Sequence, residues 1–455
     1  MTREPTSRPT IQTPTGSASD PASHPVPGPA PEPSPELDRL FRGVTPAVGR
    51  ILERALAGEE VGQTEAVRLF QAQGVDLLAL MAVADELRRR QVGERITFVK
   101  VRNINFTNVC YTGCQFCAFG LPRQDPEAYT FSIQEVVEQA VEAWEWGCTE
   151  VCMQGGLNPQ LGGEIYFQLV AAIKERLPAI HIHAFSPFEI QYASQLLGQS
   201  VETILRRLKE LGLGSIPGTA AEILDPEVRR ILTKNKLSAE AWVEIITTAH
   251  RVGLPSTATI MYGHVDEPRH WVAHLDLLRR IQRETGGFTE LVPLGFIHEK
   301  TRLYASGLAR PGPTGMESVK MHAVARLMLG RDIPNLQVSW VKLGRAMSQL
   351  CLQAGANDFG GTLINERISR MAGATTGQYL PPEEMERLIL DLGRVPAERT
   401  TLYQIVHEGP RHYDPARPDT MRPFEPRNNG QPPVVASQRA PISLIASPRT
   451  RDNGS

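Results

Sequence analysis

The chain has 455 residues, of which 41% are apolar, and its 48 basic residues nearly balance its 50 acidic ones. This balance gives no electrostatic reason to expect nucleic acid or an anionic membrane as a partner. The sequence has no apolar run approaching the roughly 20 residues that span a bilayer, and no apolar segment typical of a secretory leader. It therefore predicts a soluble, cytoplasmic protein.

The two ends of the chain differ in composition from its middle. Residues 1–36 hold ten of the 36 prolines, and such a segment buries too little apolar surface to offset its ordering entropy. Residues 406–455 have a similar character, so both are expected to be disordered tails. Between them, helical spacing of apolar residues predicts a helical extension over 37–94. Residues 95–405 are expected to form the main domain with its C-terminal helices.

From residue 95 onward, strand-like and helix-like patterns alternate. The expected strands cover residues 97–104, 150–154, 180–185, 213–216, 257–262, 290–294, 337–340 and 358–363. The clearest helical patterns cover residues 133–146, 200–211, 239–251, 269–284 and 318–329. Repeated units of this length predict an α/β fold with a parallel sheet covered by helices, and about eight of them predict a (β/α)8 barrel of the TIM type. In such a barrel the chemistry lies on the loops after the strands.

A cysteine motif follows the first expected strand. Cys110, Cys114 and Cys117 have the spacing C-x-x-x-C-x-x-C, and three thiolates in one loop can hold three irons of a cubane cluster while the fourth iron stays open. A structural zinc site is the alternative. Zinc usually takes four protein ligands in paired spacing, and the sequence offers no convincing second pair. Clustered cysteines in a long chain also suggest a reducing compartment.

The aromatic residue before the last cysteine completes a pattern that resembles the radical S-adenosylmethionine (SAM) superfamily. The resemblance implies that Cys110, Cys114 and Cys117 hold one 4Fe-4S cluster and that SAM binds the open iron. Reductive cleavage of SAM in that superfamily gives a 5′-deoxyadenosyl radical. The resemblance also implies SAM contacts at Phe116, Gly155, Gly156, Met261 and Gly263, and Glu222, which follows the fourth expected strand, is a further candidate.

Most of these contacts have alternatives or depart from the superfamily pattern. Met261 and Gly263 lie in a segment with the central glycine and terminal acid of the superfamily's GxIxGxxE motif but without its first glycine. The superfamily has a Glu after the glycine pair where this chain has Leu157, so only backbone contacts carry over to Gly155 and Gly156. A simple strand-to-helix turn is the alternative there. Glu222 can bind the SAM ribose or a substrate amine, or serve only as a favourable charge at a helix N-terminus.

Longer stretches carry a closer resemblance. Residues 103–110, 215–224, 256–265, 340–344 and 354–363 are together similar to the 4-hydroxyphenyl-transferring subunits of deazaflavin synthases. The match covers roughly residues 45–405. It implies cleavage of L-tyrosine at Cα–Cβ, transfer of the 4-hydroxybenzyl group to 5-amino-6-(D-ribitylamino)uracil, and release of 2-iminoacetate, methionine and 5′-deoxyadenosine.

The same resemblance implies an electron donor and a separate ring-closing radical SAM subunit as partners, and a place in coenzyme F-420 biosynthesis. Alternatives within the superfamily are an aminofutalosine synthase-like enzyme of menaquinone synthesis and a tyrosine lyase of thiazole synthesis. An alternative of another class is a metal-binding scaffold without turnover.

Polar residues at the ends of the other expected strands are candidates for holding the substrates. His181 and His183 lie two apart on one strand and therefore face the same side, although both can equally be ordinary surface or core histidines. Lys342 can neutralise a substrate carboxylate or phenolate, or take part in a solvated salt bridge. The candidate substrate-binding residues are His181, His183, Thr219, Glu290, His298, Lys342, Asp358 and Thr362.

Overall fold

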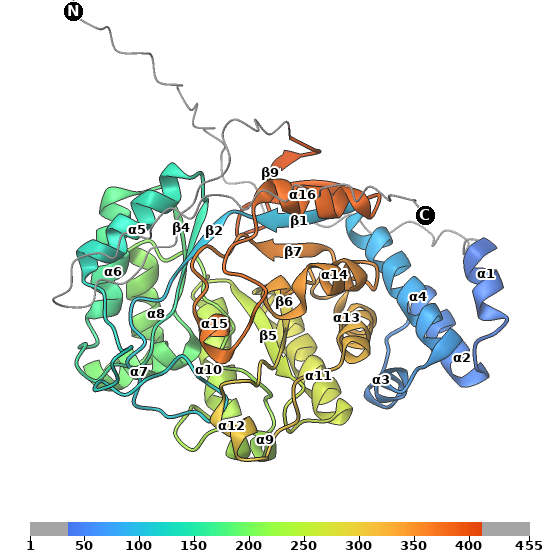
Figure 1. The fold of residues 1–455 in the computed structure, drawn as a ribbon, viewed down its shortest axis with the longest axis horizontal. Coiled ribbons are helices and arrows are strands. Elements are labelled where there is room, and N and C mark those ends of the chain that lie inside the picture. The colour runs from blue at the N-terminus through green and yellow to red at the C-terminus, as the bar shows by residue number, and fades with distance from the viewer. Residues whose placement is uncertain (1–34, 412–455) are drawn as a thin grey trace, which may run out of the picture.

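The computed structural model describes residues 35–411. Its first barrel strand is divided at Lys100 into two parts, and parallel neighbours follow it around the barrel (Figure 1). The named barrel strands are β1 (Arg95–Val99), β2 (Val101–Ile104), β3 (Glu150–Met153), β4 (His181–Ala184), β5 (Ser256–Tyr262), β6 (Phe288–Gly295) and β7 (Asp358–Gly361). In the sheets, β2 pairs with β3, β3 with β4, β5 with β6, and β7 with β1.

Short parallel bridges close the ring where no named strand is present. Ser215 bridges to β4 and Ile216 to β5, so these two residues occupy the fourth position of the barrel. Leu336 bridges to β6 and Gln337 to β7, which fills the seventh position. The eight-stranded TIM-type barrel predicted from the sequence is therefore confirmed, with two of its strands reduced to a pair of isolated bridges each.

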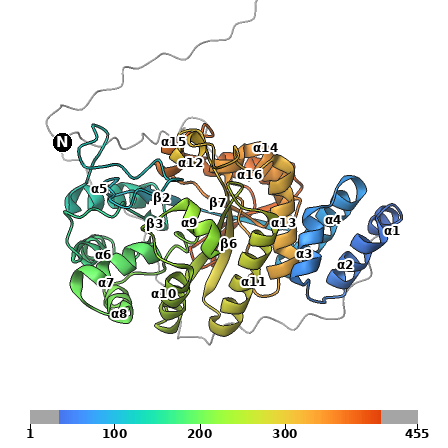
Figure 2. The ribbon, with the colours of Figure 1, turned by 90° about the horizontal axis from the view of Figure 1, so that it is seen from below.

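Helices surround this ring (Figure 2). They are α5 (Ile133–Glu145), α6 (Ile165–Arg176), α7 (Pro187–Leu197), α8 (Val201–Glu210), α9 (Pro226–Leu232), α10 (Ala239–Arg251), α11 (Pro268–Thr285), α12 (Arg302–Ala305), α13 (Gly315–Leu329), α14 (Trp340–Leu352), α15 (Ile368–Ala372) and α16 (Pro382–Asp391). Capping boxes begin α5 at Ser132 and α7 at Ser186, where the third helical residue is a Glu that bonds back to the cap. These reciprocal bonds satisfy N–H groups that a helix leaves free at its start.

Four helices precede the barrel, α1 (Pro35–Phe41), α2 (Pro46–Leu56), α3 (Gln63–Phe70) and α4 (Gly74–Val92). They lie together at one side of the barrel, where α3 contacts α11 and α13 and α4 contacts α13 (Figure 1). The Phe70 ring packs edge-on against Trp271 of α11, with 5.0 Å between ring centroids. Within residues 35–411, none of the helices combines the length and the apolar character needed to cross a bilayer.

The C-terminal strands β8 (Val395–Arg399) and β9 (Ile405–Glu408) lie at the N-terminal end of the barrel strands. β8 pairs in parallel with β1 over its whole length, from Arg95–Val395 to Val99–Arg399, and β9 pairs antiparallel with β8. Consequently β1 lies between β7 and β8, whereas its continuation β2 lies beside β3.

The structure differs from the expected elements in four places. The strand expected over 213–216 is reduced to the bridges at Ser215 and Ile216. The first expected strand, 97–104, is broken at Lys100. The strand expected over 337–340 is one bridge followed by α14, which already begins at Trp340. β9 occupies the first residues of the expected C-terminal tail, because its backbone pairs with β8. The rest of that tail and nearly all of the N-terminal tail lie outside the described residues.

Candidate active site

A cavity of about 410 Å³ lies inside the barrel. It extends from the cysteine loop after β2 to side chains at the N-terminal ends of β3 and β6. Twelve of the residues singled out from the sequence line it: Cys110, Cys114, Phe116, Cys117, Gly155, Gly156, His183, Thr219, Glu222, Met261, Glu290 and Lys342. Side chains that are up to 232 positions apart in the sequence are therefore brought to one enclosed space.

The cysteine loop is fixed by backbone hydrogen bonds. The Cys110 N–H donates to the Leu121 carbonyl at 2.9 Å, and the Cys117 N–H donates to the Cys114 carbonyl at 3.3 Å. Gly120 lies between two of the thiols: a Cβ there would be 3.6 Å from the Cys110 sulfur and 3.9 Å from the Cys117 sulfur. Its N–H also donates to the Cys117 sulfur at 3.4 Å.

These three cysteines fit an iron–sulfur cluster. Burial raises the pKa of the Cys114 and Cys117 thiols, so their thiolates require a strongly cationic partner, which bound iron supplies. Within residues 35–411, no three His, Cys, Asp or Glu side chains converge closely enough to hold a single metal ion. A four-iron cluster is larger than one ion, and thiols that hold it need not converge on one point.

The glycine pair after β3 is packed too closely for any side chain. A Cβ at Gly155 would lie 2.5 Å from the Phe106 ring, and one at Gly156 would lie 2.4 Å from the Val109 carbonyl oxygen. The Gly155 N–H donates to Oε1 of Glu189 at 2.9 Å. Glu189 is the capping-box residue of α7 and lines the cavity, and burial raises its pKa to about 7. The turn is thus held by a carboxylate from the next strand–helix unit.

Glu222 is neutralised by basic residues that follow it in the chain. Its Oε1 lies 2.5 Å from the Lys236 ammonium, and its Oε2 lies 3.5 Å from Arg229. The same ammonium lies 5.0 Å from the centroid of the Phe116 ring, within cation–π range. Glu222 is not part of a helix, since α9 begins at Pro226, and the helix-charge interpretation therefore does not apply. The Glu222 carbonyl accepts the Met261 N–H at 3.0 Å.

His181 and His183 share one partner, the Ser215 hydroxyl, which lies 2.7 Å from Nε2 of His181 and 2.7 Å from Nδ1 of His183. Burial lowers the pKa of His181 to about 4 and that of His183 to about 3. Both rings are therefore neutral at pH 7, and one hydroxyl satisfies a ring nitrogen on each. Of the two histidines, His183 lines the cavity and His181 does not.

Lys342 and Thr219 lie in the cavity wall with polar partners. The Lys342 ammonium donates to the Ser369 hydroxyl at 2.5 Å, and burial lowers its pKa, against the opposing charge of Glu366. Its side chain is half-buried and its hydrogen bond goes to a hydroxyl, so the structure does not support the solvated salt bridge considered as an alternative. The Thr219 hydroxyl donates to the Gln154 side chain at 3.1 Å.

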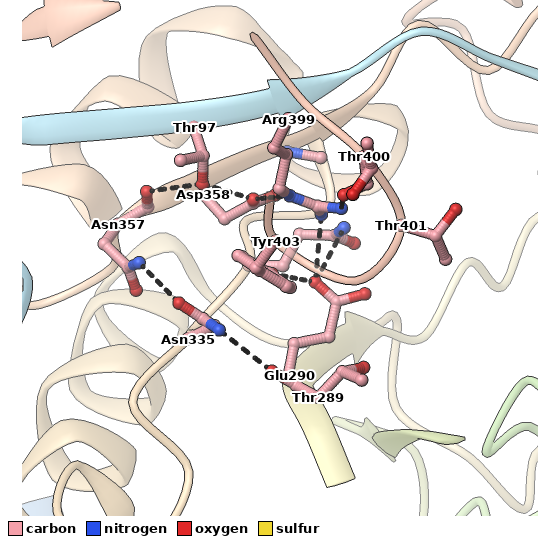
Figure 3. A network of polar contacts seen from close by, with 12 residues as sticks. Thr97, Thr289, Glu290, Asn335, Asn357, Asp358, Arg399, Thr400, Thr401 and Tyr403 are labelled. Atoms are coloured by element: carbon pink, nitrogen blue, oxygen red, sulfur yellow. Dashed lines mark hydrogen bonds and ion pairs between the residues drawn. The ribbon is translucent and has the colours of Figure 1, made fainter. Parts of the chain in front are cut away.

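A buried polar network forms the end of the cavity that lies farthest along the strands from the cysteine loop (Figure 3). The Arg399 guanidinium contacts Asp358 through Nε at 2.5 Å and Glu290 through Nη2 at 3.2 Å. It also stacks 3.9 Å from the centroid of the Tyr403 ring, and the Tyr403 hydroxyl donates to Glu290. Burial raises the pKa of Glu290, while Arg399 opposes that rise.

Two residues that were predicted to bind substrate, Asp358 and Thr362, instead make hydrogen bonds within the protein. The Asp358 carboxylate accepts from Thr97 and Arg399 on one oxygen, at 2.5 Å each, and from the Gly360 N–H on the other at 2.7 Å. The Thr362 hydroxyl accepts the Val101 N–H at 2.9 Å and donates to the Val101 carbonyl at 2.8 Å. Neither side chain lines the cavity. Their hydrogen bonds hold the barrel together, and the structure does not support the expectation that they grip a substrate.

Gly263 and His298 also lie outside the cavity lining. Gly263 has φ +92°, and a Cβ there would lie 2.5 Å from Pro313, so only glycine fits this turn. The His298 ring packs on Tyr304 with 4.4 Å between centroids.

Several lining residues are not apparent from the sequence. The sequence around Glu189 indicates only a capping box, and Lys236 is one of many basic residues. Arg399 and Thr401 follow the last barrel helices, where no motif marks them. One sequence signal points toward Glu189. The superfamily has an acid where this chain has Leu157, so another segment can supply an acid to the same turn.

The chain matches two family models. The model described as the radical SAM superfamily matches residues 104–278, and the model described as the CofH/MqnC C-terminal region matches residues 285–412. The 5-amino-6-(D-ribitylamino)uracil–L-tyrosine 4-hydroxyphenyl transferase of Methanopyrus kandleri is 51% identical over 361 residues, which cover 79% of this chain and 97% of that protein.

Longer relatives and more distant structures also match. The FO synthase of Streptomyces coelicolor is 53% identical over 344 residues, 76% of this chain but 40% of that protein. The chain thus spans less than half the length of the FO synthases it resembles. The crystal structure of methylornithine synthase aligns with a TM-score of 0.61 at 18% identity, covering 76% of this chain and 97% of that one. The FeFe-hydrogenase maturase HydG from Carboxydothermus hydrogenoformans aligns with a TM-score of 0.60 at 16% identity, covering 81% and 83%. Both structures show the shared fold alone.

Proposed function

Because this chain belongs to the radical SAM superfamily and, within it, to the family of the tyrosine 4-hydroxyphenyl transferases, we propose that it cleaves L-tyrosine at Cα–Cβ and transfers the 4-hydroxybenzyl group to 5-amino-6-(D-ribitylamino)uracil. The products besides the adduct are 2-iminoacetate, methionine and 5′-deoxyadenosine. The observation that carries the proposal is identity of 51% across 97% of the Methanopyrus transferase. The cysteine loop lies within the radical SAM match at residues 104–278, and residues from both matched regions line the cavity.

Membership in the superfamily implies a 4Fe-4S cluster and SAM as cofactors. Cys110, Cys114 and Cys117 would hold the cluster through their thiolates, and the cavity wall beside them would hold SAM. When bound, the two together supply a 5′-deoxyadenosyl radical. Phe116 offers a ring face, while Gly155 and Gly156 offer backbone groups in the cavity lining. Gly263 contributes indirectly, by shaping the turn that follows Met261.

The protein's own residues bind, orient and keep water away from the reacting groups. A carbon radical abstracts hydrogen from almost any group it meets, so an enclosed barrel interior protects the reaction. The Lys342 ammonium is suited to a substrate carboxylate or phenolate, because it lines the cavity and its hydrogen bond to Ser369 goes to a neutral group. Glu222, paired with Lys236, can accept hydrogen bonds from ribose or amine groups without adding net charge.

The remaining partners also belong to this proposal. An electron donor must reduce the cluster, and a separate ring-closing radical SAM subunit would use the adduct to complete the deazaflavin chromophore of coenzyme F-420. The FO synthases are more than twice as long as the region that matches this chain. A cytoplasmic location suits all of these steps, because the cluster requires reducing conditions.

The test is a reconstitution under anaerobic conditions. Protein loaded with iron and sulfide is incubated with SAM, a strong reductant, L-tyrosine and 5-amino-6-(D-ribitylamino)uracil. We expect 5′-deoxyadenosine that forms only when tyrosine is present, together with a 4-hydroxybenzyl adduct of the uracil identified by mass spectrometry. Release of free p-cresol without an adduct, or turnover only with a different acceptor, would move the protein to another branch of the superfamily. Zinc without iron would exclude the enzyme.

A further inference from the structure

Polar groups at the N-terminal end of the barrel form a floor to the cavity, which we define as Glu150, Glu290, Gln337, Arg399 and Thr401. Glu150 is the first residue of β3, and Glu290 is near the start of β6. Each of the two carboxylates is only 6% exposed. Acids buried to this extent are costly unless a partner compensates them.

Each glutamate of the floor has one oxygen free for a ligand. Oε2 of Glu290 accepts from Tyr403, from Arg399 at 3.2 Å and from Gln337 at 3.4 Å. Oε2 of Glu150 accepts the Thr401 hydroxyl at 2.7 Å. Within residues 35–411, no donor contacts Oε1 of either residue, although both side chains line the cavity.

The single cation of the floor does not balance these two acids. Arg399 is bound most closely by Asp358, which lies behind the floor at 2.5 Å. Burial raises the pKa of both Glu150 and Glu290, as expected for carboxyls short of cationic partners. Around them, Gln337 and Thr401 add both donors and acceptors. A ligand with several hydroxyl groups matches this mixture, since each hydroxyl donates to an oxygen and accepts from a neighbour.

We propose that Glu150 and Glu290 bind the ribityl hydroxyls of 5-amino-6-(D-ribitylamino)uracil, an assignment that rests on the proposed function. The reacting atoms must lie beside the cysteine loop, because the radical forms there. The floor lies at the opposite ends of the strands, so only the part of a substrate that does not react can reach it. The ribityl chain is that part of the acceptor.

The test measures equilibrium binding without turnover. Holoenzyme with cluster and SAM, but without reductant, is titrated anaerobically with the ribitylated uracil and with 5,6-diaminouracil, which lacks the chain. Glu150→Gln is the lead variant, because the hydrogen bond of the Glu150 side chain goes to Thr401 and not to Arg399, so the change leaves the hydrogen bonds of Arg399 in place. We expect its Kd for the ribitylated compound to rise on the order of tenfold, as for loss of a charged hydrogen bond. Its Kd for 5,6-diaminouracil should change less than twofold.

Further variants separate binding from folding. Thr401→Val should shift the same Kd in the same direction, since it leaves Glu150 without its donor. Glu138→Gln, an exposed site on α5, is the matched control and should change neither Kd. Thermal unfolding identifies any variant that fails to fold.

Three results would overturn the assignment: unaltered protein that binds both uracils equally, variants that weaken both equally, or variants that weaken tyrosine binding instead. Failure of the proposed function has a different signature, namely unaltered holoenzyme that forms no 5′-deoxyadenosine in response to tyrosine once reductant is added.

Discussion

Oε1 of Glu189 accepts the backbone N–H of Gly155 at 2.9 Å, so one carboxylate caps α7 and also holds the turn after β3. Its other oxygen accepts the N–H and the hydroxyl of Ser186, at 2.8 and 2.6 Å. This chain has Leu157 where the superfamily places an acid after the glycine pair. Glu189 brings an acid to the same turn from a different helix.

Replacing Glu189 should therefore affect both stability and SAM binding. Glu189→Ala removes three hydrogen bonds in a buried setting, and we expect a loss of about 1–3 kcal/mol in the free energy of unfolding. SAM should bind more weakly to the reconstituted protein, because the turn at Gly155 loses its support. Urea unfolding and anaerobic SAM titration measure the two effects. Glu135→Ala is the matched control, since Glu135 has the same capping role on α5 away from the cavity. Equal SAM affinity in both variants would restrict Glu189 to helix capping.

Cys114→Ala should abolish cluster binding while the fold is retained. The barrel core is built from apolar side chains throughout residues 35–411, and its burial rather than the cluster supplies most of the stability. Iron and sulfide content, absorbance near 400 nm and 5′-deoxyadenosine formation should all fall to background. Far-UV circular dichroism should stay unchanged. Cys148→Ala, at a buried cysteine outside the cavity, should keep its iron. Insoluble Cys114→Ala protein would show that the cluster is also a structural element.

Thr362→Val distinguishes a structural hydroxyl from a substrate-binding one. The change leaves the buried Val101 N–H without an acceptor, so we expect a loss of about 1–3 kcal/mol in the free energy of unfolding. The Kd for 5-amino-6-(D-ribitylamino)uracil should remain within twofold of the unaltered protein. A large rise in that Kd with normal stability would restore Thr362 as a ligand of the ribityl chain.

His183 should make stability depend on pH. Burial lowers its pKa to about 3 in the folded protein, whereas an unfolded chain titrates near the ordinary value of about 6.5. Between these values the unfolded state binds a proton that the folded state does not, so the free energy of unfolding falls as pH falls below about 6.5. The slope for one such proton is about 1.4 kcal/mol per pH unit.

His183→Gln removes this proton, and its unfolding free energy should fall less steeply with acid. Urea midpoints of both proteins between pH 5 and 7 give the comparison. Parallel curves for the two proteins would show that His183 has the same pKa in the folded and unfolded states, contrary to the effect of its burial.

The sequence was sufficient to predict the barrel and the cysteine loop, because both depend on local patterns. Apolar runs and helical spacing locate the units, and Cys110, Cys114 and Cys117 are close together in the chain. The break at Lys100 could not be predicted, since it reflects two different neighbours: β8 beside β1 and β3 beside β2. The residues around Lys100 carry no pattern that indicates this change of neighbouring strand.

Side-chain roles at the strand ends were much harder to predict. Asp358 and Thr362 lie in one Gly-rich segment, and both side chains are suited to binding a ligand. In the structure they make hydrogen bonds with Thr97, Arg399 and Val101 instead. Those partners lie 41 to 261 positions away in the chain. Arg399 itself has no local pattern, so its place beneath Glu290 follows only from the pairing of β8 with β1.

That pairing couples the end of the chain to whatever occupies the cavity. Arg399 is the last residue of β8 and Thr401 lies between β8 and β9. Both residues line the cavity. A ligand that contacts Arg399 and Thr401 stabilises the docked state of this segment. Docking of the segment strengthens ligand binding by the same free energy, because the coupling is reciprocal. Backbone amides over 395–408 should therefore exchange with deuterium more slowly when the cavity is filled, which makes the C-terminal strand pair a built-in reporter of occupancy.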